Sequence, residues 1–238
     1  MLFNSSIFIY LFLPITLLGF HIIGGGGYHR IALAWLVTAS LFFYGWWNFA
    51  YLWLISSSVI FNYVVGISLR SSANRGVLIL GVTCNLALIG YYKYANFFVD
   101  NLNVLIGDAL ILETIILPLA ISFFTFQQIT YLADARRGLV KTRGFIEYCL
   151  FVTFFPQLIA GPIVHHSEIM PQYARRRVFR VIPSNLAIGL TFFAIGLFKK
   201  VVIADNIAIF ATPVFSAAND PETSIEFFQA WTGALAYT

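Results

Sequence analysis

Charged side chains are scarce in this chain. Of its 238 residues, 14 are Lys or Arg and 10 are Asp or Glu, whereas 60% are hydrophobic and the mean hydropathy is +0.84. Soluble domains carry roughly 25% charged residues, against 10% here. Because so few charges cannot keep a chain of this hydropathy in water, a soluble globular domain is excluded. The sequence predicts an all-α, polytopic transmembrane helical bundle.

Cysteine is rare as well, and the net charge is small. Cys84 and Cys149 lie within apolar segments and show no metal-type spacing. Two isolated thiols form neither a disulfide framework nor a ligand cluster, so we interpret them as buried free cysteines and expect no metal site. The net charge of +4 is scattered between hydrophobic segments, which argues against nucleic-acid binding.

Complete catalytic motifs are also missing. The sequence has no Gly-x-Ser-x-Gly elbow and no His-x-x-x-His pair, and the glycine run at 24–27 lacks the Lys-Ser/Thr of a phosphate-binding loop. His165 and His166 could act as general bases near neutral pH. Both stand beside polar residues, however, so we favour a solvated loop end. No catalytic residue is therefore predicted in these 238 residues.

Apolar stretches long enough to cross a membrane fill most of the chain. A helix needs about 20 apolar residues to cross the hydrocarbon core, which leaves room for six to eight crossings. The expected segments are 7–23, 31–47, 51–69, 77–92, 115–133, 145–163 and 185–204, then a shorter one at 207–215 and a last one that runs to Thr238.

The basic residues indicate the orientation of these segments. With the amino terminus outside, the loops at Arg30, at Arg70 and Arg75, and at 136–143 fall in the cytoplasm. The acidic stretch 100–113 then falls outside. This alternation follows the positive-inside rule.

The apolar segment 145–163 is interrupted by Pro156, Gln157, Gly161 and Pro162. Irregular backbone is tolerated at membrane depth only where protein or a water-filled cavity surrounds it. A full crossing would also place the arginines of 175–180 outside, against the positive-inside rule. Both observations favour a re-entrant segment that turns back here, and they make these four residues candidates for a substrate path.

Polar side chains inside other apolar segments are further candidates. Lys199 and Lys200 need to reach the interface, find a partner or line a wet cavity. Asp205 is a nearby partner, and we favour a structural pair over a role toward an anionic donor, while counting both lysines as substrate-path candidates. Gln127 and Gln128 are expected to hydrogen-bond between helices, with the lining of a polar path as the alternative.

Six groups of short motifs span nearly the whole chain in a fixed order. They are FNSS at 3–6 with LFLP at 11–14, FFYGWW at 42–47, GYYKYANF at 90–97, LPLAISFFTF at 117–126 with Tyr131, Asp134, Arg137 and Gly138, FPQLIAGPI at 155–163, and KKVVIAD at 199–205. Together they resemble the membrane-bound O-acyltransferase family, and most closely its bacterial alginate O-acetylation branch.

This resemblance implies a ring of tilted helices around a thinned membrane centre. It also implies transfer of an acyl group, in this branch acetyl, from a cytoplasmic donor to a hydroxyl of an envelope polysaccharide. The donor would be an acyl carrier protein or acyl-CoA, used as a co-substrate with no bound cofactor. Membrane lipids and the polysaccharide acetylation machinery of the bacterial inner membrane would be partners. Arg175, Arg176 and Arg177 would suit an acidic donor that docks from the cytoplasm.

The general-base histidine of the family lies in later segments, and neither His165 nor His166 falls on its motif. We therefore expect residues 1–238 to form a single membrane domain, the amino-terminal part of the fold, inactive alone and with the catalytic histidine beyond Thr238. A transporter or lipid-handling channel is the alternative, because broken helices with intramembrane polar residues also form transporter sites. Inverted repeats would favour it, and no convincing one is visible.

The re-entrant segment predicts that Arg176 lies at the cytoplasmic face. In an Arg176→Cys variant, a membrane-impermeant thiol reagent should leave the new cysteine unlabelled in intact cells and should label it after permeabilisation. The parent chain gives the background from Cys84 and Cys149. Labelling of intact cells above that background would overturn the re-entrant geometry.

Overall fold

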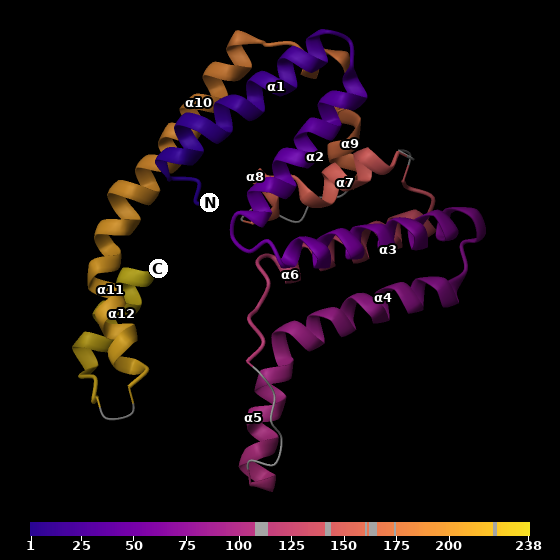
Figure 1. The fold of residues 1–238 in the computed structure, drawn as a ribbon. Helices are drawn as coiled ribbons and strands as arrows, with labels where there is room; N and C mark the ends of the chain where they lie inside the picture. The colour runs from indigo at the N-terminus through magenta and orange to yellow at the C-terminus, as the bar shows by residue number, and fades with distance from the viewer. Residues whose placement is uncertain (108–113, 141–143, 160, 162–165, 174, 221–222) are drawn as a thin grey trace. The chain divides into compact units, whose positions relative to one another are not determined.

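The computed structural model describes residues 1–107, 114–140, 144–159, 161, 166–173, 175–220 and 223–238. These residues form helices and turns, with no strand among them, which confirms the all-α prediction (Figure 1). They divide into two compact units, one of Met1 with Phe12–Arg180 and one of Leu2–Leu11 with Val181–Thr238. That the whole chain forms one membrane domain stays a prediction.

The first unit contains most of the helices. They are α1 (Leu13–Gly25), α2 (His29–Gly45), α3 (Tyr51–Ser72), α4 (Arg75–Ile89), the π-helix η2 (Gly90–Tyr94), α5 (Ala95–Ile106), α6 (Ile121–Arg136), α7 (Phe145–Thr153), α8 (Phe155–Leu158), α9 (His166–Tyr173) and the 3₁₀-helix η3 (Arg176–Phe179). Helices α1 and α2 form a hairpin, and α2 packs on α7.

The second unit is built on one long helix. It runs through α10 (Pro183–Phe198), the π-helix η4 (Lys199–Ala204) and α11 (Asp205–Ala218), and α12 (Phe227–Tyr237) packs against α11. The close approach of α11 and α12 depends on Gly233, because a Cβ at this position would lie 2.6 Å from Val214 Cγ1. The π-helix η1 (Phe8–Phe12) leads directly into α1 of the first unit.

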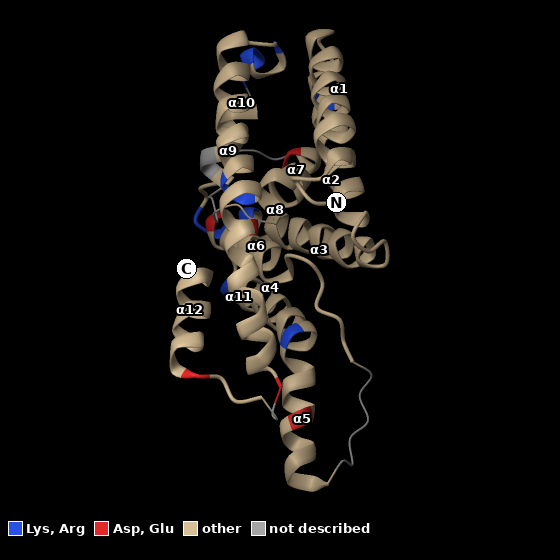
Figure 2. Cartoon of the chain, turned by 90° about the vertical axis from the view of Figure 1, so that its left-hand side faces the viewer, with Lys and Arg blue, Asp and Glu red and all other residues tan. Residues whose placement is uncertain are grey.

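Four helical stretches of the described residues are long and apolar enough to cross a membrane, so the chain is a membrane protein. They are Phe8–Gly25, Tyr51–Ser72, Arg75–Ile106 and Pro183–Ala218. Figure 2 shows how few acidic and basic residues these helices carry.

The expectation of six to eight crossings exceeds these four. Two of the predicted segments are parts of longer helices, because the helices that contain their ends at Tyr92 and Ala204 continue to Ile106 and Ala218. In each case the chain passes through a π-helical turn that contains no proline, so the helix is not ended there. Segment 115–133 also becomes helical only from Ile121, after Pro118 and a left-handed Ala120.

The core of the first unit lies where α3, α6 and α7 meet. Two glycines allow α3 and α4 to pack closely against α6. A Cβ at Gly66 would lie 2.5 Å from Tyr131 Cε1, and one at Gly81 would lie 2.8 Å from Leu132 Cδ1. The most deeply buried side chains here are Ile55, Leu69, Ile121, Phe124, Tyr131, Leu132, Tyr148 and Phe151.

A buried amide network joins α3, α4 and α6 within this core. Gln128 Oε1 accepts hydrogen bonds from Ser58 Oγ at 3.0 Å and from Asn62 Nδ2. Asn62 also donates to Asn85 Oδ1 at 3.2 Å, and Asn85 Nδ2 donates to Asn62 Oδ1 at 2.7 Å. Gln127 Nε2 donates to the Phe151 carbonyl of α7 at 2.8 Å. The interpretation of both glutamines as interhelical hydrogen-bonding residues is confirmed.

The two cysteines have different environments. Cys149 is buried in the core on α7, as expected, but Cys84 is exposed. The expectation for Cys84 is wrong because α4 turns only one side toward α3 and α6, where Gly81 and Asn85 are buried, and Cys84 lies on another side.

Replacement of Gly66 by alanine should destabilise the first unit by about 1–3 kcal/mol, because the new methyl group has to displace the buried Tyr131 ring. Gly90→Ala is the matched control, since a Cβ there meets nothing within 4 Å. Thermal unfolding of both variants in detergent measures the difference. Equal midpoints would contradict the close α3–α6 contact.

Candidate functional site

The interrupted segment forms two short helices. Phe154 (φ −54°, ψ 109°) ends α7, and the four-residue α8 follows with Pro156 near its start. With nine residues, α7 is roughly 14 Å long, about half the hydrocarbon thickness. The predicted interruption is therefore confirmed, although it begins at Phe154, before Pro156. Pro162 lies outside the described residues, and the return to the same membrane face stays a prediction.

The start of α8 is anchored by α2. Ser40, which is fully buried, accepts a hydrogen bond from the Phe155 backbone N–H at 3.2 Å and donates to the Leu36 carbonyl at 2.7 Å. The Phe155 ring packs against Phe12 and Phe43, with centroid distances of 5.2 and 5.4 Å. At the break, the Phe155 N–H thus has a hydrogen-bond acceptor, and the Phe155 side chain packs against aromatic rings.

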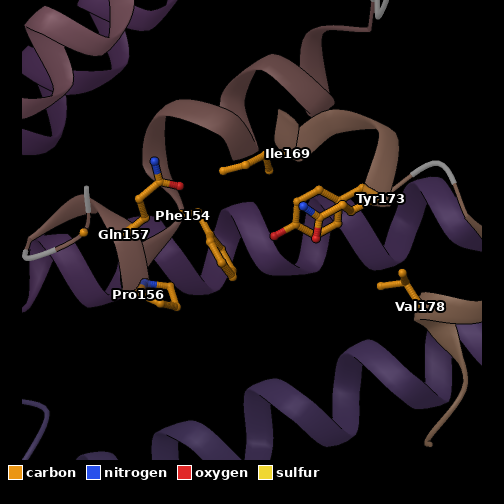
Figure 3. A pocket seen from close by; sticks show the side chains of 8 residues that line it. Phe154, Pro156, Gln157, Ile169, Tyr173 and Val178 are labelled. Atoms are coloured by element: carbon orange, nitrogen blue, oxygen red, sulfur yellow. The ribbon is translucent and has the colours of Figure 1, made fainter. Parts of the chain in front are cut away.

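A cavity of about 500 Å³ opens beside this break (Figure 3). Side chains from α8, α9 and η3 face it, and its lining is mostly apolar. The lining residues are Phe154, Pro156, Gln157, Gly161, Ile169, Gln172, Tyr173 and Val178. Three of the substrate-path candidates, Pro156, Gln157 and Gly161, therefore meet in one pocket. Its volume is that of a small-molecule site, in which a few polar groups orient a ligand within apolar walls.

Tyr173 contributes a hydroxyl to this lining. Burial raises the pKa of its phenol, because the charged phenolate would lose its hydration. The side chain therefore stays protonated at neutral pH and can donate a hydrogen bond to a ligand. Together with the amides of Gln157 and Gln172, it gives an otherwise apolar pocket its polar groups.

The candidate docking arginines lie next to this pocket. Arg175, Arg176 and Arg177 are exposed and immediately precede Val178, which lines the pocket. The turn is closed by a hydrogen bond from the Val178 N–H to the Arg175 carbonyl at 3.0 Å. Two sets of sequence candidates thus come together at one place, a mostly apolar pocket and a basic rim.

Lys199 and Lys200 belong to the second unit, so they do not join the pocket as one described site. Lys200 forms an ion pair with Asp205, which confirms the predicted partner. Both side chains of the pair are about half exposed, and the pair joins the π-helical turn η4 to the first residue of α11. The helix therefore passes these two charges without a break.

His166 is not at a solvated loop end, and that expectation was wrong. Its side chain is 3% exposed at the start of α9 and packs against the rings of Phe151 and Tyr131, with centroid distances of 5.1 and 5.6 Å. Burial and the charge of Arg70 lower its pKa to about 4, while the Asp134 carboxylate acts in the opposite direction. The imidazole is therefore neutral at pH 7. His165 lies outside the described residues.

Nothing in the local sequence around His166 signals this burial. Its neighbours Tyr131 and Phe151 come from α6 and α7, and only the tertiary packing brings them to α9. Within the described part of the chain, no three His, Cys, Asp or Glu side chains gather as they would around a metal ion.

The sequence of this chain is similar to those of bacterial proteins named as O-acetylating enzymes. It is 42% identical to a peptidoglycan O-acetyltransferase of Helicobacter pylori, and 40% and 38% identical to probable alginate O-acetylases AlgI of Pseudomonas aeruginosa and Azotobacter vinelandii. Each match covers the whole chain and 50%, 45% and 47% of the respective relative. The resemblance to the membrane-bound O-acyltransferase family is confirmed.

The chain thus spans about half the length of the curated relatives it matches. No family model and no solved structure matches it. Of the motifs that carry the resemblance to this acyltransferase family, 117–126 includes the start of α6, which packs on α7, and 155–163 contributes Pro156, Gln157 and Gly161 to the pocket lining.

Loss of the Ser40 hydroxyl should loosen the pocket wall. Ser40→Ala leaves the buried Phe155 N–H without its acceptor and should cost about 1–3 kcal/mol of unfolding free energy. Thr38→Ala is the control, because that exposed hydroxyl donates only to Ala34 in its own helix. Detergent unfolding midpoints compare the two, and an equally small effect of both would contradict the anchoring of α8.

Proposed function

We propose that this chain is part of a membrane O-acyltransferase. The enzyme moves an acyl group, most simply acetyl, from a cytoplasmic donor to a hydroxyl of an envelope polysaccharide. The observation that carries this proposal is the match along the full chain to proteins named as O-acetyltransferases. The acceptors in those names, peptidoglycan and alginate, are different glycans, so the proposal specifies a polysaccharide hydroxyl and leaves the polymer open.

In this proposal the pocket beside the broken segment forms the cytoplasmic part of the donor path. Its apolar walls would exclude water from a reactive thioester, and the Gln157 and Gln172 amides with the Tyr173 hydroxyl would orient the acyl carbonyl. Pro162 stays a candidate for the same path by its place in the sequence. Lys199 and Lys200 stay substrate-path candidates within the second unit.

In this proposal the docking arginines attract an anionic donor to the pocket. An acyl carrier protein and acyl-CoA are both anionic, so either would be attracted to Arg175, Arg176 and Arg177 at the pocket rim. The proposed setting is the bacterial inner membrane, with the polysaccharide acetylation machinery as partner. No catalytic role is assigned to His166, because it is packed among aromatic rings and does not line the pocket.

The reaction itself needs only a base and a leaving group. The acceptor oxygen bonds to the acyl carbon, the bond from that carbon to the donor sulfur breaks, and the hydroxyl proton passes through a general base to the released thiolate. A transporter or lipid-handling channel is not favoured, since the relatives carry acetyltransferase names.

The direct test uses the full-length protein in proteoliposomes. It is supplied with an acetyl thioester donor on the cytoplasmic side and glycan oligomers on the other, and ester formation is measured by mass spectrometry. We expect acetyl esters that depend on both substrates. Flux of donor or lipid without ester formation would overturn the proposal.

Charge reversal of the arginine rim should weaken donor use. Arg176→Glu is expected to lower turnover at subsaturating donor by about tenfold, corresponding to roughly 1.4 kcal/mol of lost attraction. Arg75→Glu is the control, because Arg75 is equally exposed but starts α4, where a carboxylate is tolerated by the helix dipole. Initial rates across donor concentrations distinguish them, and equal rates would remove the docking role.

A further inference from the structure

We propose that the hairpin of α1 and α2 holds the arginine-bearing turn at the pocket rim through Phe179, and that Gly24 is a positioning residue for donor binding. The arginine turn is here Arg175 to Arg180. This inference rests on the docking role proposed above for Arg175, Arg176 and Arg177. It adds a part of the molecule far away in sequence to the donor site.

Few interactions within the arginine turn itself stabilise its conformation. Its only regular element is the four-residue 3₁₀-helix η3, and such short turns have weak internal hydrogen bonding. Arg175, Arg176, Arg177 and Arg180 are exposed, whereas Phe179 between them is 3% exposed. Burial of this one aromatic ring is therefore the main apolar contact that fixes the four guanidinium groups to the protein.

The Phe179 ring packs against residues of the α1–α2 hairpin. The ring stacks on His29, the first residue of α2, with a centroid distance of 4.3 Å, and lies 5.3 Å from the ring of Phe20 on α1. The Phe179 carbonyl accepts a hydrogen bond from His21 Nδ1–H at 3.4 Å. Side chain and backbone of Phe179 are thus both held by the hairpin.

Gly24 makes room for this ring. A Cβ on Gly24 would lie 2.6 Å from Phe179 Cδ1 and 2.9 Å from Phe179 Cβ. Since the second contact involves the base of the side chain, rotation of the ring alone cannot relieve the clash, and η3 itself would have to move. An alanine at this position therefore acts on the arginine turn without touching an arginine.

The hairpin is stiff enough to act as a fixed support. Trp35 Nε1 of α2 donates to the Thr16 carbonyl of α1 at 3.0 Å, and the same indole fills the space above Gly19. Phe179 also shares one apolar cluster with hairpin residues, and the pocket residues Phe154, Tyr173 and Val178 pack against that cluster. Phe179 is thus held in the same apolar cluster that adjoins the pocket.

A displaced arginine turn should weaken capture of the donor and leave the reacting atoms unchanged. Loss of binding that is shared by ground state and transition state raises KM at constant kcat. Gly24→Ala should accordingly raise the KM for the donor by about tenfold, with kcat unchanged. The free-energy cost of one extra methyl group in a tightly packed site typically changes an equilibrium constant by about this factor.

The experiment compares Gly24→Ala with Gly25→Ala in the full-length protein. Gly25 is the next residue of α1, and a Cβ there meets nothing within 4 Å. Hydrogen–deuterium exchange is read at the Val178 and Arg180 amides, which bond to the Arg175 and Arg177 carbonyls. We expect faster exchange at both amides and a higher donor KM in Gly24→Ala, and neither change in Gly25→Ala.

A third variant tests the contact between the two residues. Phe179→Leu places a smaller side chain opposite Gly24, so adding it to Gly24→Ala should recover part of the exchange protection and of the donor affinity. Non-additive effects of the two substitutions would measure their coupling. Additive effects would overturn the assignment of Gly24 as the residue against which Phe179 packs.

The remaining outcomes separate this inference from the proposed function. Equal exchange in Gly24→Ala and Gly25→Ala would overturn the hairpin support, whatever the enzyme does. Faster exchange with unchanged donor KM would overturn the positioning role of Gly24 and the docking role of the arginines. Failure of the parent protein to form any ester would refute the proposed function instead, because the exchange measurement needs no substrate.

Discussion

The backbone break after Phe154 is the constraint on which the rest of the first unit depends. In a membrane an interrupted helix leaves polar backbone groups that only protein or enclosed water can satisfy. Here Ser40 of α2 accepts from the Phe155 N–H, and aromatic rings from the α1–α2 region enclose the residue that follows the break. The break can thus persist, and the space that it creates becomes the pocket.

The polar side chains of the core also hold the first unit in one arrangement, through hydrogen bonds between helices. Between helices surrounded by lipid, apolar burial gives little preference for one packing over another, so small residues and interhelical hydrogen bonds determine the register. Gly66 and Gly81 bring α3 and α4 against α6, and the amides of Asn62, Asn85 and Gln128 meet at that contact. This fixed core positions α7, from which the interrupted segment begins.

The site combines chemistry from parts of the chain that are far apart in sequence. The pocket belongs to the motif that carries the family resemblance, the basic rim to the turn before α10, and the support of that rim to the amino-terminal hairpin. Because one apolar cluster underlies all three, the proposed donor site depends on packing in several parts of the first unit. In that proposal, residues that do not touch the donor affect how it is bound.

Composition and residue order determined the helical character of this protein, the position of its broken segment and one ion pair. The scarcity of charge required helices that satisfy their own backbone, Pro156 and Gly161 marked the break, and the spacing of Lys200 and Asp205 predicted their ion pair. Tertiary structure alone decided the burial of His166 and the fit of Phe179 against Gly24. Hydropathy and helix-breaking residues act locally, whereas these contacts join elements up to 155 positions apart, and no local pattern encodes such a meeting.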